Sequence, residues 1–140
     1  MLQLDTSTEF GARVERRLND EQVIWLTTVG SSGMPASVPV WFLWDGATML
    51  IYSQPDTPKL RHIERSPKVQ LNFNSDSSGG DVIRIEGSAA VDGATPPATG
   101  VPEFVEKYRA AIERLGTTPE GFAGAYSTPV RVTPSRVRGH

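Results

Sequence analysis

The sequence predicts a mainly β, α+β fold, in which an antiparallel barrel or strongly bent sheet of six strands carries a few peripheral helices. Six runs rich in β-branched, aromatic or alternating apolar residues are separated by turn residues. Helical periodicity is confined to the ends and crossovers, which argues against a doubly wound α/β fold. The 140 residues suit one domain with its own core, spanning residues 1–140.

The first predicted element is a short amphipathic helix. Thr6 and Glu9 have the spacing of a capping box, which places Thr6 at the N-cap. Phe10, Val14 and Leu18 follow at helical spacing, and the helix is expected to end near Asn19.

A hairpin is predicted next. Residues 23–29, VIWLTTV, have the composition of a strand, and residues 30–33, GSSG, have that of a turn. The second strand is expected from about Ala36 to Trp44. Pro39 removes a ladder donor inside this strand, which requires an edge, a bulge or a gap. Two interpretations stay open, because Pro39 could blunt an edge strand or leave a gap for a planar ligand.

A second hairpin and a basic helix follow. Asp45 and Gly46 predict a tight turn into a third strand over residues 48–53. Pro58 suits the first position of a helix, with Thr57 or Asp56 as its cap. The helix is expected to direct its apolar side chains inward and to end before Pro67.

The second half of the chain continues the meander. Residues 68–74 and 83–91 alternate apolar and polar side chains as half-exposed strands, joined by the loop 75–80. A rigid connection over 93–100 leads to a second amphipathic helix from Phe104 to Leu115, capped by Gly116, and to a short helical turn from Thr118. The last strand is centred on Val130 and Val132 between two prolines, and a mobile tail is expected over 136–139.

Composition excludes several classes of function. The net charge of −2 gives no electrostatic case for nucleic acid, and no apolar run is long enough for a membrane span. The absence of cysteine removes disulfides, thiolate metal sites and thiol nucleophiles. The N-terminus lacks the pattern of a secretory leader, so a cytoplasmic location is the expectation.

No catalytic or metal-binding motif is present. The two histidines, His62 and His140, are too few to build a metal site. No serine lies in a Gly-x-Ser-x-Gly elbow, and the 30–33 turn lacks the lysine of a phosphate-binding loop. We therefore expect neither a catalytic side chain nor a bound metal.

Positive charge lies at the N-terminal end of the basic helix, where it opposes the helix dipole. Lys59 and Arg61 lie in its first turn, where unpaired N–H groups and the helix dipole already favour an anion. One interpretation is a solvated helix face neutralised by Asp56 and Glu64. The other is a phosphate held by the two side chains together with the free N–H groups.

These segments resemble a known superfamily. The strand from Val38 to Trp41, the Asp45-Gly46 turn, the strand from Leu50 to Ser53 and the helix from Pro58 to Ile63 are similar to pyridoxamine-5′-phosphate-oxidase-like split β-barrel proteins. Within that superfamily the chain most resembles the B-type flavin/deazaflavin oxidoreductases of actinobacteria, which use the deazaflavin coenzyme F420. Residues 129–139 resemble the closing strand of that group.

The resemblance implies a homodimer with a cofactor groove at the subunit interface and a small-molecule substrate. Lys59 and Arg61 would bind the cofactor phosphate. The implied remainder of the cofactor site is Ser53, Gln54 and Thr57 around the phosphate and Pro39, Val40 and Trp41 along the ring, with Ile51 and Tyr52 as support. Hydride transfer then needs no reactive side chain, because the deazaflavin supplies the chemistry.

Alternatives remain at this stage. FMN shares a tricyclic ring and a phosphate with F420, so the two basic residues do not distinguish the cofactors. A split-barrel protein that binds flavin or haem without turnover is the alternative to an enzyme. We expect Trp41 and Trp44 to be core or interface residues first, and contacts of the cofactor ring second.

Overall fold

The structure, a computed structural model, describes residues 2–140, which form one curled antiparallel sheet with helices around it. Seven strands within this range pair in the order β2-β1-β5-β6-β7-β4-β3. The strands are β1 Val23–Val29, β2 Pro35–Trp41, β3 Leu43–Trp44, β4 Met49–Ser53, β5 Lys68–Asn72, β6 Ile83–Val91 and β7 Thr128–Gly139. The predicted fold class is confirmed. The seventh strand arises because the predicted second strand is interrupted at Phe42.

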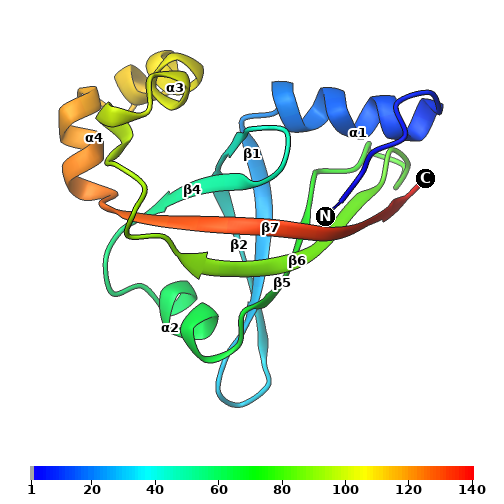
Figure 1. Cartoon of the computed structure of the whole chain (residues 1–140), viewed down its shortest axis with the longest axis horizontal. Coiled ribbons are helices and arrows are strands. Elements are labelled where there is room, and N and C mark those ends of the chain that lie inside the picture. Colours follow the sequence, from blue (N-terminus) through cyan, green and yellow to red (C-terminus); the bar gives the residue numbers. More distant parts are fainter. Residues whose placement is uncertain (1) are drawn as a thin grey trace.

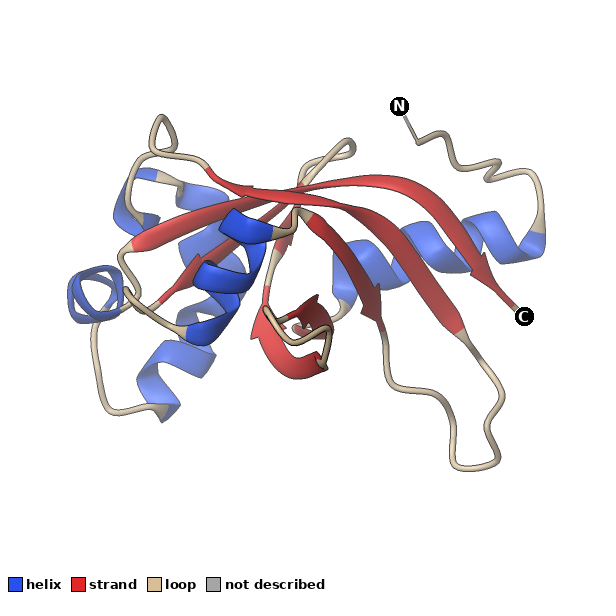
Figure 2. Cartoon of the chain, turned by 90° about the horizontal axis from the view of Figure 1, so that it is seen from below, coloured by secondary structure: helices blue, strands red, loops and turns tan. Residues whose placement is uncertain are grey.

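Helices cover the two ends of the sheet. They are α1 Glu9–Asp20, α2 Pro58–Arg65, α3 Pro102–Arg114 and α4 Pro119–Ala125, with a short 3-10 turn, η1, at Ala98–Gly100. Figures 1 and 2 show α2, α3 and α4 at one end of the molecule and α1 with the C-terminus at the other. Within residues 2–140, no helix is long and apolar enough to cross a membrane.

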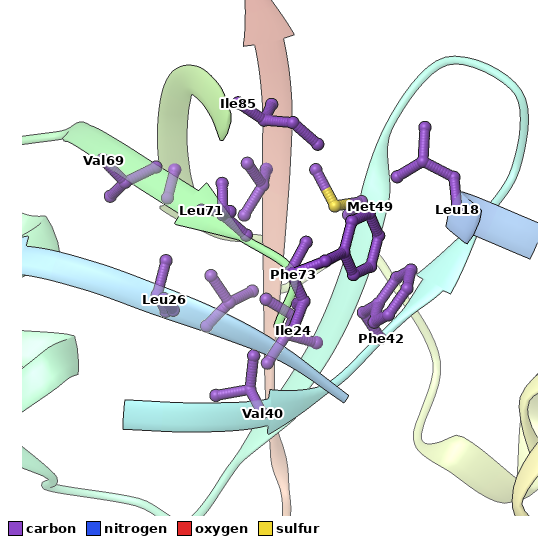
Figure 3. Packing of buried hydrophobic residues seen from close by; sticks show 14 of the residues in the cluster. Leu18, Ile24, Leu26, Val40, Phe42, Met49, Val69, Leu71, Phe73 and Ile85 are labelled. Carbon is purple, nitrogen blue, oxygen red and sulfur yellow. The ribbon is translucent and has the colours of Figure 1, made fainter. Parts of the chain in front are cut away.

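The concave face of the sheet holds the main core. Apolar side chains from β1, β2, β4, β5, β6 and β7 converge there, together with Phe42 and Phe73, which follow β2 and β5. Figure 3 shows part of this cluster, including Val40, Phe42 and Met49. Leu18 of α1 and Ile63 of α2 close this core from either side and are almost fully buried. This inward position of α2 anchors the basic first turn of that helix to the sheet.

A second, aromatic cluster lies on the opposite face of β4. Phe104, Tyr108 and Ile112 of α3 and Phe122 of α4 pack against Leu50 and Tyr52. All residues of β4 are consequently buried, because alternate side chains enter different cores. The strand that ends at the basic helix is thus fixed on both faces.

Local details correct two predictions at the chain ends. Thr8, rather than Thr6, caps α1, since its Oγ1 accepts a hydrogen bond from the Gly11 N–H at 3.0 Å. Residues 136–139 form the end of β7 and pair with β6, so the prediction of a mobile tail is wrong. Pro134 is accommodated there because it pairs with Gly87 beside a register shift of the two strands.

Pro39 lies on an edge strand, as one interpretation required. The hydrogen bond from the Gly30 N–H to the Met34 carbonyl, 3.0 Å long, sets the alternation of the β1–β2 ladder. By that alternation Pro35, Ser37 and Pro39 direct their backbone nitrogens away from β1. Two of these three outward positions lack an N–H, which hinders another strand from pairing with this edge.

Candidate functional site

The candidate site begins where β4 runs into α2. Thr57 is the N-cap residue of α2 and Pro58 occupies its first turn, as predicted. The Thr57 side chain, however, forms no capping hydrogen bond with the helix. Its Oγ1 instead lies 3.1 Å from the Ser53 Oγ, and the Ser53 hydroxyl donates to the Gln54 carbonyl at 2.8 Å. Pro58 has no N–H, and the N–H groups of Leu60 and Arg61 donate to the Thr57 carbonyl at 3.1 and 3.4 Å. Within residues 2–140, the N–H of Lys59 is therefore the one in the first turn of α2 that has no partner.

A pocket of about 240 Å³ opens between the edge strand, β4, α2 and the helical end of the molecule. Its lining residues are Pro39, Val40, Trp41, Tyr52, Lys59, Leu115, Phe122 and Tyr126. Four of the predicted cofactor residues, Pro39, Val40, Trp41 and Lys59, thus meet at one cavity. The wall is otherwise aromatic and aliphatic.

Within the described range 2–140, Lys59 is the only charged residue that lines this pocket. It is half-buried, and burial lowers the pKa of its ammonium group. Among residues 2–140, no carboxylate forms an ion pair with it. A partly desolvated cation without a counter-ion, set in an apolar wall, favours binding of an anionic group.

Trp41 belongs to a continuous stack of rings. Its indole lies 4.6 Å from the Tyr108 ring at an interplanar angle of 5° and 5.3 Å from the Phe122 ring at 16°. Phe122 in turn stacks on Tyr126 at 4.7 Å. The pocket wall is therefore a set of rings whose orientations are fixed by one another, suited to a planar ligand.

Arg61 lies apart from Lys59. Its side chain borders a different hollow, of about 670 Å³ between α2 and β6, and its guanidinium donates to the Asp56 carbonyl at 2.7 Å. Residues two apart on a helix point in nearly opposite directions, which accounts for the separation. The structure therefore does not bring the two predicted phosphate ligands to one cavity.

The other predicted residues surround the start of α2. Ser53 is buried, Thr57 is half-buried and Gln54 is exposed, and none of them lines the pocket. Of the two supporting residues, Tyr52 lines the pocket, whereas Ile51 faces the main core. The roles of all these residues in cofactor binding stay predictions.

Three pocket residues were missed in the sequence. Leu115 is the C-cap residue of α3, Phe122 belongs to α4, and Tyr126 is the C-cap residue of α4. The spacing of the two aromatic residues, four positions apart, would have predicted that they share a helix face. Nothing in the sequence would have predicted that this face meets β2 and Lys59.

Neither histidine forms part of the pocket. His62 Nδ1 lies 2.8 Å from the Thr28 Oγ1 and ties α2 to β1, while the His140 backbone pairs with Val82. Within residues 2–140, no group of three or more His, Cys, Asp or Glu side chains is arranged to hold a metal ion.

Two arginines of β7, Arg131 and Arg138, have partners inside the chain. Arg131 donates to Asp92, Thr95 and Thr48 and lies near Asp45, which joins β7 to two turns. Arg138 lies 3.9 Å from Glu86. Arg131 is thus engaged in the fold rather than held ready for a ligand.

The curled antiparallel sheet, with a pocket that Lys59 lines beside the edge strand β2, is typical of a split β-barrel protein. The sequence profile of the pyridoxamine 5′-phosphate oxidase family matches residues 10–140, and the chain belongs to that family. No protein with a curated function matches it.

Solved structures agree with this fold. An F420 reductase has a TM-score of 0.69 at 20% identity, over 89% of this chain and 94% of the other. General Stress Protein 26 from Bacillus anthracis has a TM-score of 0.67 at 19% identity, over 90% and 89%. The haem storage protein HutZ from Vibrio cholerae has a TM-score of 0.64 at 13% identity, over 99% and 95%. At these identities the likeness concerns the fold.

Proposed function

We propose that this protein is an oxidoreductase that uses coenzyme F420 to transfer hydride to a conjugated small-molecule acceptor. The observation that carries the proposal is Lys59, an unpaired, half-buried cation in a pocket that is otherwise apolar and aromatic. A phosphorylated tricyclic cofactor has the matching chemistry, an anionic phosphate joined to a planar ring system. The likeness to an F420 reductase of the same fold favours the deazaflavin over FMN.

The chain's own residues would bind and orient the cofactor. The Lys59 side chain would pair with the phosphate, assisted by the Lys59 backbone N–H at the start of α2 and by Ser53, Gln54 and Thr57. Pro39, Val40 and Trp41 would line the ring and exclude water from one of its faces. When bound, the deazaflavin supplies the hydride chemistry, so a pocket without a nucleophile or metal suffices.

A second subunit would complete the site. The pocket in one chain, about 240 Å³, is smaller than the roughly 300–1,000 Å³ typical of sites for drug-sized ligands. Leu115 at its rim is 58% exposed, a large value for an apolar side chain beside a ligand pocket. We therefore propose a homodimer, which light scattering would detect as a mass of about twice the 15.2 kDa of one chain.

Haem binding without turnover is the second candidate, favoured by the fold that the chain shares with the haem storage protein. The two candidates differ in the residue that they require. Haem iron needs an axial ligand, commonly histidine, and neither histidine of this chain lines the pocket. A phosphorylated ring needs only the lysine and the apolar walls.

Equilibrium titration of the purified protein with F420, FMN and haemin tests the proposal. We expect F420 to bind with a Kd of about 1 μM, or roughly −8 kcal/mol, and FMN at least about tenfold more weakly. Reduced F420 should then be oxidised when a conjugated acceptor is added. Preference for FMN would overturn the choice of cofactor, and tight haemin binding without F420 binding would favour the storage function.

A further inference from the structure

The interruption of the sheet at Phe42 lies immediately beside the pocket residue Trp41. Strand β2 ends at Trp41 and β3 begins at Leu43, so the backbone of Phe42 belongs to neither ladder. Its side chain is fully buried in the main core. A buried backbone N–H and carbonyl outside a ladder need other partners, since leaving them unpaired is costly.

Two consecutive residues of α3 provide these partners. The Phe42 N–H donates to the Tyr108 hydroxyl at 2.8 Å, and the hydroxyl reaches the Gln22 carbonyl at 2.6 Å and the Phe42 carbonyl at 2.8 Å. The Lys107 ammonium donates to the same Phe42 carbonyl at 2.9 Å. Its Nζ also lies 3.9 Å from the centre of the Phe42 ring, within the range of a cation–π contact.

The same helix also sets the plane of the neighbouring indole. The Tyr108 ring stacks on Trp41 at 4.6 Å and 5°, while its hydroxyl holds the next residue of the chain. Tyr108 is 0% exposed, so its ring and hydroxyl have little freedom to rearrange. Burial raises the pKa of the Tyr108 phenol, which keeps the hydroxyl protonated and able to donate.

We propose that Lys107 and Tyr108 are positioning residues, which clamp the backbone of Phe42 and thereby orient Trp41 against the cofactor ring. Neither residue lines the pocket, so both act through Trp41. The inference rests on the proposed function for the role of the pocket, but the clamp itself concerns the protein without a ligand. The two claims can therefore fail separately.

The test uses variants that remove one contact at a time. Tyr108→Phe keeps the stacked ring and removes the hydroxyl, whereas Lys107→Met keeps the packing of the stem and removes the donor. Lys107→Arg retains a donor and is the conservative rescue. Ile112→Val, in the same helix and the same cluster, is the matched control because it loosens the packing without touching Phe42.

The first readout is the spectrum of Trp41 without any ligand. In a Trp25→Phe, Trp44→Phe background, Trp41 is the one remaining indole. Its circular dichroism in the long-wavelength indole bands, and its emission excited in the same bands, lie beyond the absorption of tyrosine and therefore report on Trp41 alone, also in Tyr108→Phe. We expect Tyr108→Phe and Lys107→Met to reduce the near-ultraviolet signal and to shift the emission to longer wavelength. Lys107→Arg and Ile112→Val should keep both features, even where Ile112→Val lowers the melting temperature.

The second readout is the Kd for F420, which should rise about five- to tenfold in Tyr108→Phe and in Lys107→Met and stay near that of the wild type in Lys107→Arg. An unchanged Trp41 spectrum in both Tyr108→Phe and Lys107→Met would overturn the clamp. An altered spectrum with an unchanged Kd would overturn its role in cofactor binding. If the wild type binds no F420 while the spectra change as expected, the proposed cofactor is wrong and the clamp is supported.

Discussion

Replacing Lys59 by methionine should weaken cofactor binding without harming the fold. Methionine preserves most of the apolar stem that lies in the pocket wall, so the substitution chiefly removes the charge. A hydrogen bond to a charged partner contributes about 1.5–3 kcal/mol, and its loss corresponds to a Kd for F420 raised about 10- to 100-fold.

The free protein should respond in the opposite direction. Burial lowers the pKa of Lys59, which means that the folded chain carries a cost for keeping this ammonium charged. Removing the charge relieves the cost, and because the group is only half-buried we expect a gain of no more than about 0.5 kcal/mol, or roughly 2 °C in Tm.

Fluorescence titration and thermal unfolding measure these two effects on the same samples. Arg65→Met is the matched control, because it removes one positive charge from the exposed last turn of the same helix. It should leave both the Kd and the Tm close to the wild type. An unchanged Kd in Lys59→Met, or a loss of several degrees in the Tm of the free protein, would refute the assignment of Lys59 as a ligand-binding cation.

Three further substitutions test other parts of the account. Arg61→Ala should raise the Kd for F420 less than Lys59→Met does, because the Arg61 guanidinium donates to the Asp56 carbonyl at 2.7 Å and so stabilises the loop before α2. Asp56 has a φ of 61°, a conformation that glycine adopts easily, so Asp56→Gly in the Arg61→Ala background should recover part of the lost affinity. No recovery would contradict this role of Arg61. Burial lowers the pKa of Lys107 to about 8 from 10.5. The unfolded chain therefore binds the Lys107 proton more tightly than the folded chain does. In denaturant titrations, the free energy of unfolding of the wild type should rise relative to that of Lys107→Met between pH 8 and 10.5. A parallel pH dependence of the two free energies would contradict the lowered pKa. Pro39→Thr restores an outward N–H on the edge strand and should increase the rate of aggregation seen by light scattering, which Ser37→Thr should not; equal rates would show that Pro39 does not protect this edge.

The fold could be predicted largely because its hairpins are local. The β1–β2 hairpin has alternating side chains and turn residues that lie next to each other in the chain, and β1 begins and ends where the sequence predicts. The break at Phe42 could not be predicted, since its partner Tyr108 comes from a helix 66 positions later in the chain. The extent of β7 was missed for a related reason, because the register shift that accommodates Pro134 depends on β6.

The candidate site could be predicted only on one side. Pro39, Trp41 and Lys59 meet as the sequence and the resemblance implied, because strand, turn and helix follow each other closely in the chain. Phe122 and Tyr126 complete the pocket through the packing of α4, which no local pattern specifies. The separation of Lys59 and Arg61 follows from their spacing on the helix, a signal that the sequence did contain.

The most direct test compares F420 with the same deazaflavin lacking its phosphate, on the wild type and on Lys59→Met. If Lys59 holds the phosphate in the Trp41 pocket, the wild type should bind F420 at least about tenfold more tightly than the phosphate-free ring system, and Lys59→Met should lose most of this ratio. Equal loss of affinity for both ligands in the variant would show that Lys59 does not contact the phosphate, and would contradict the central claim about this pocket.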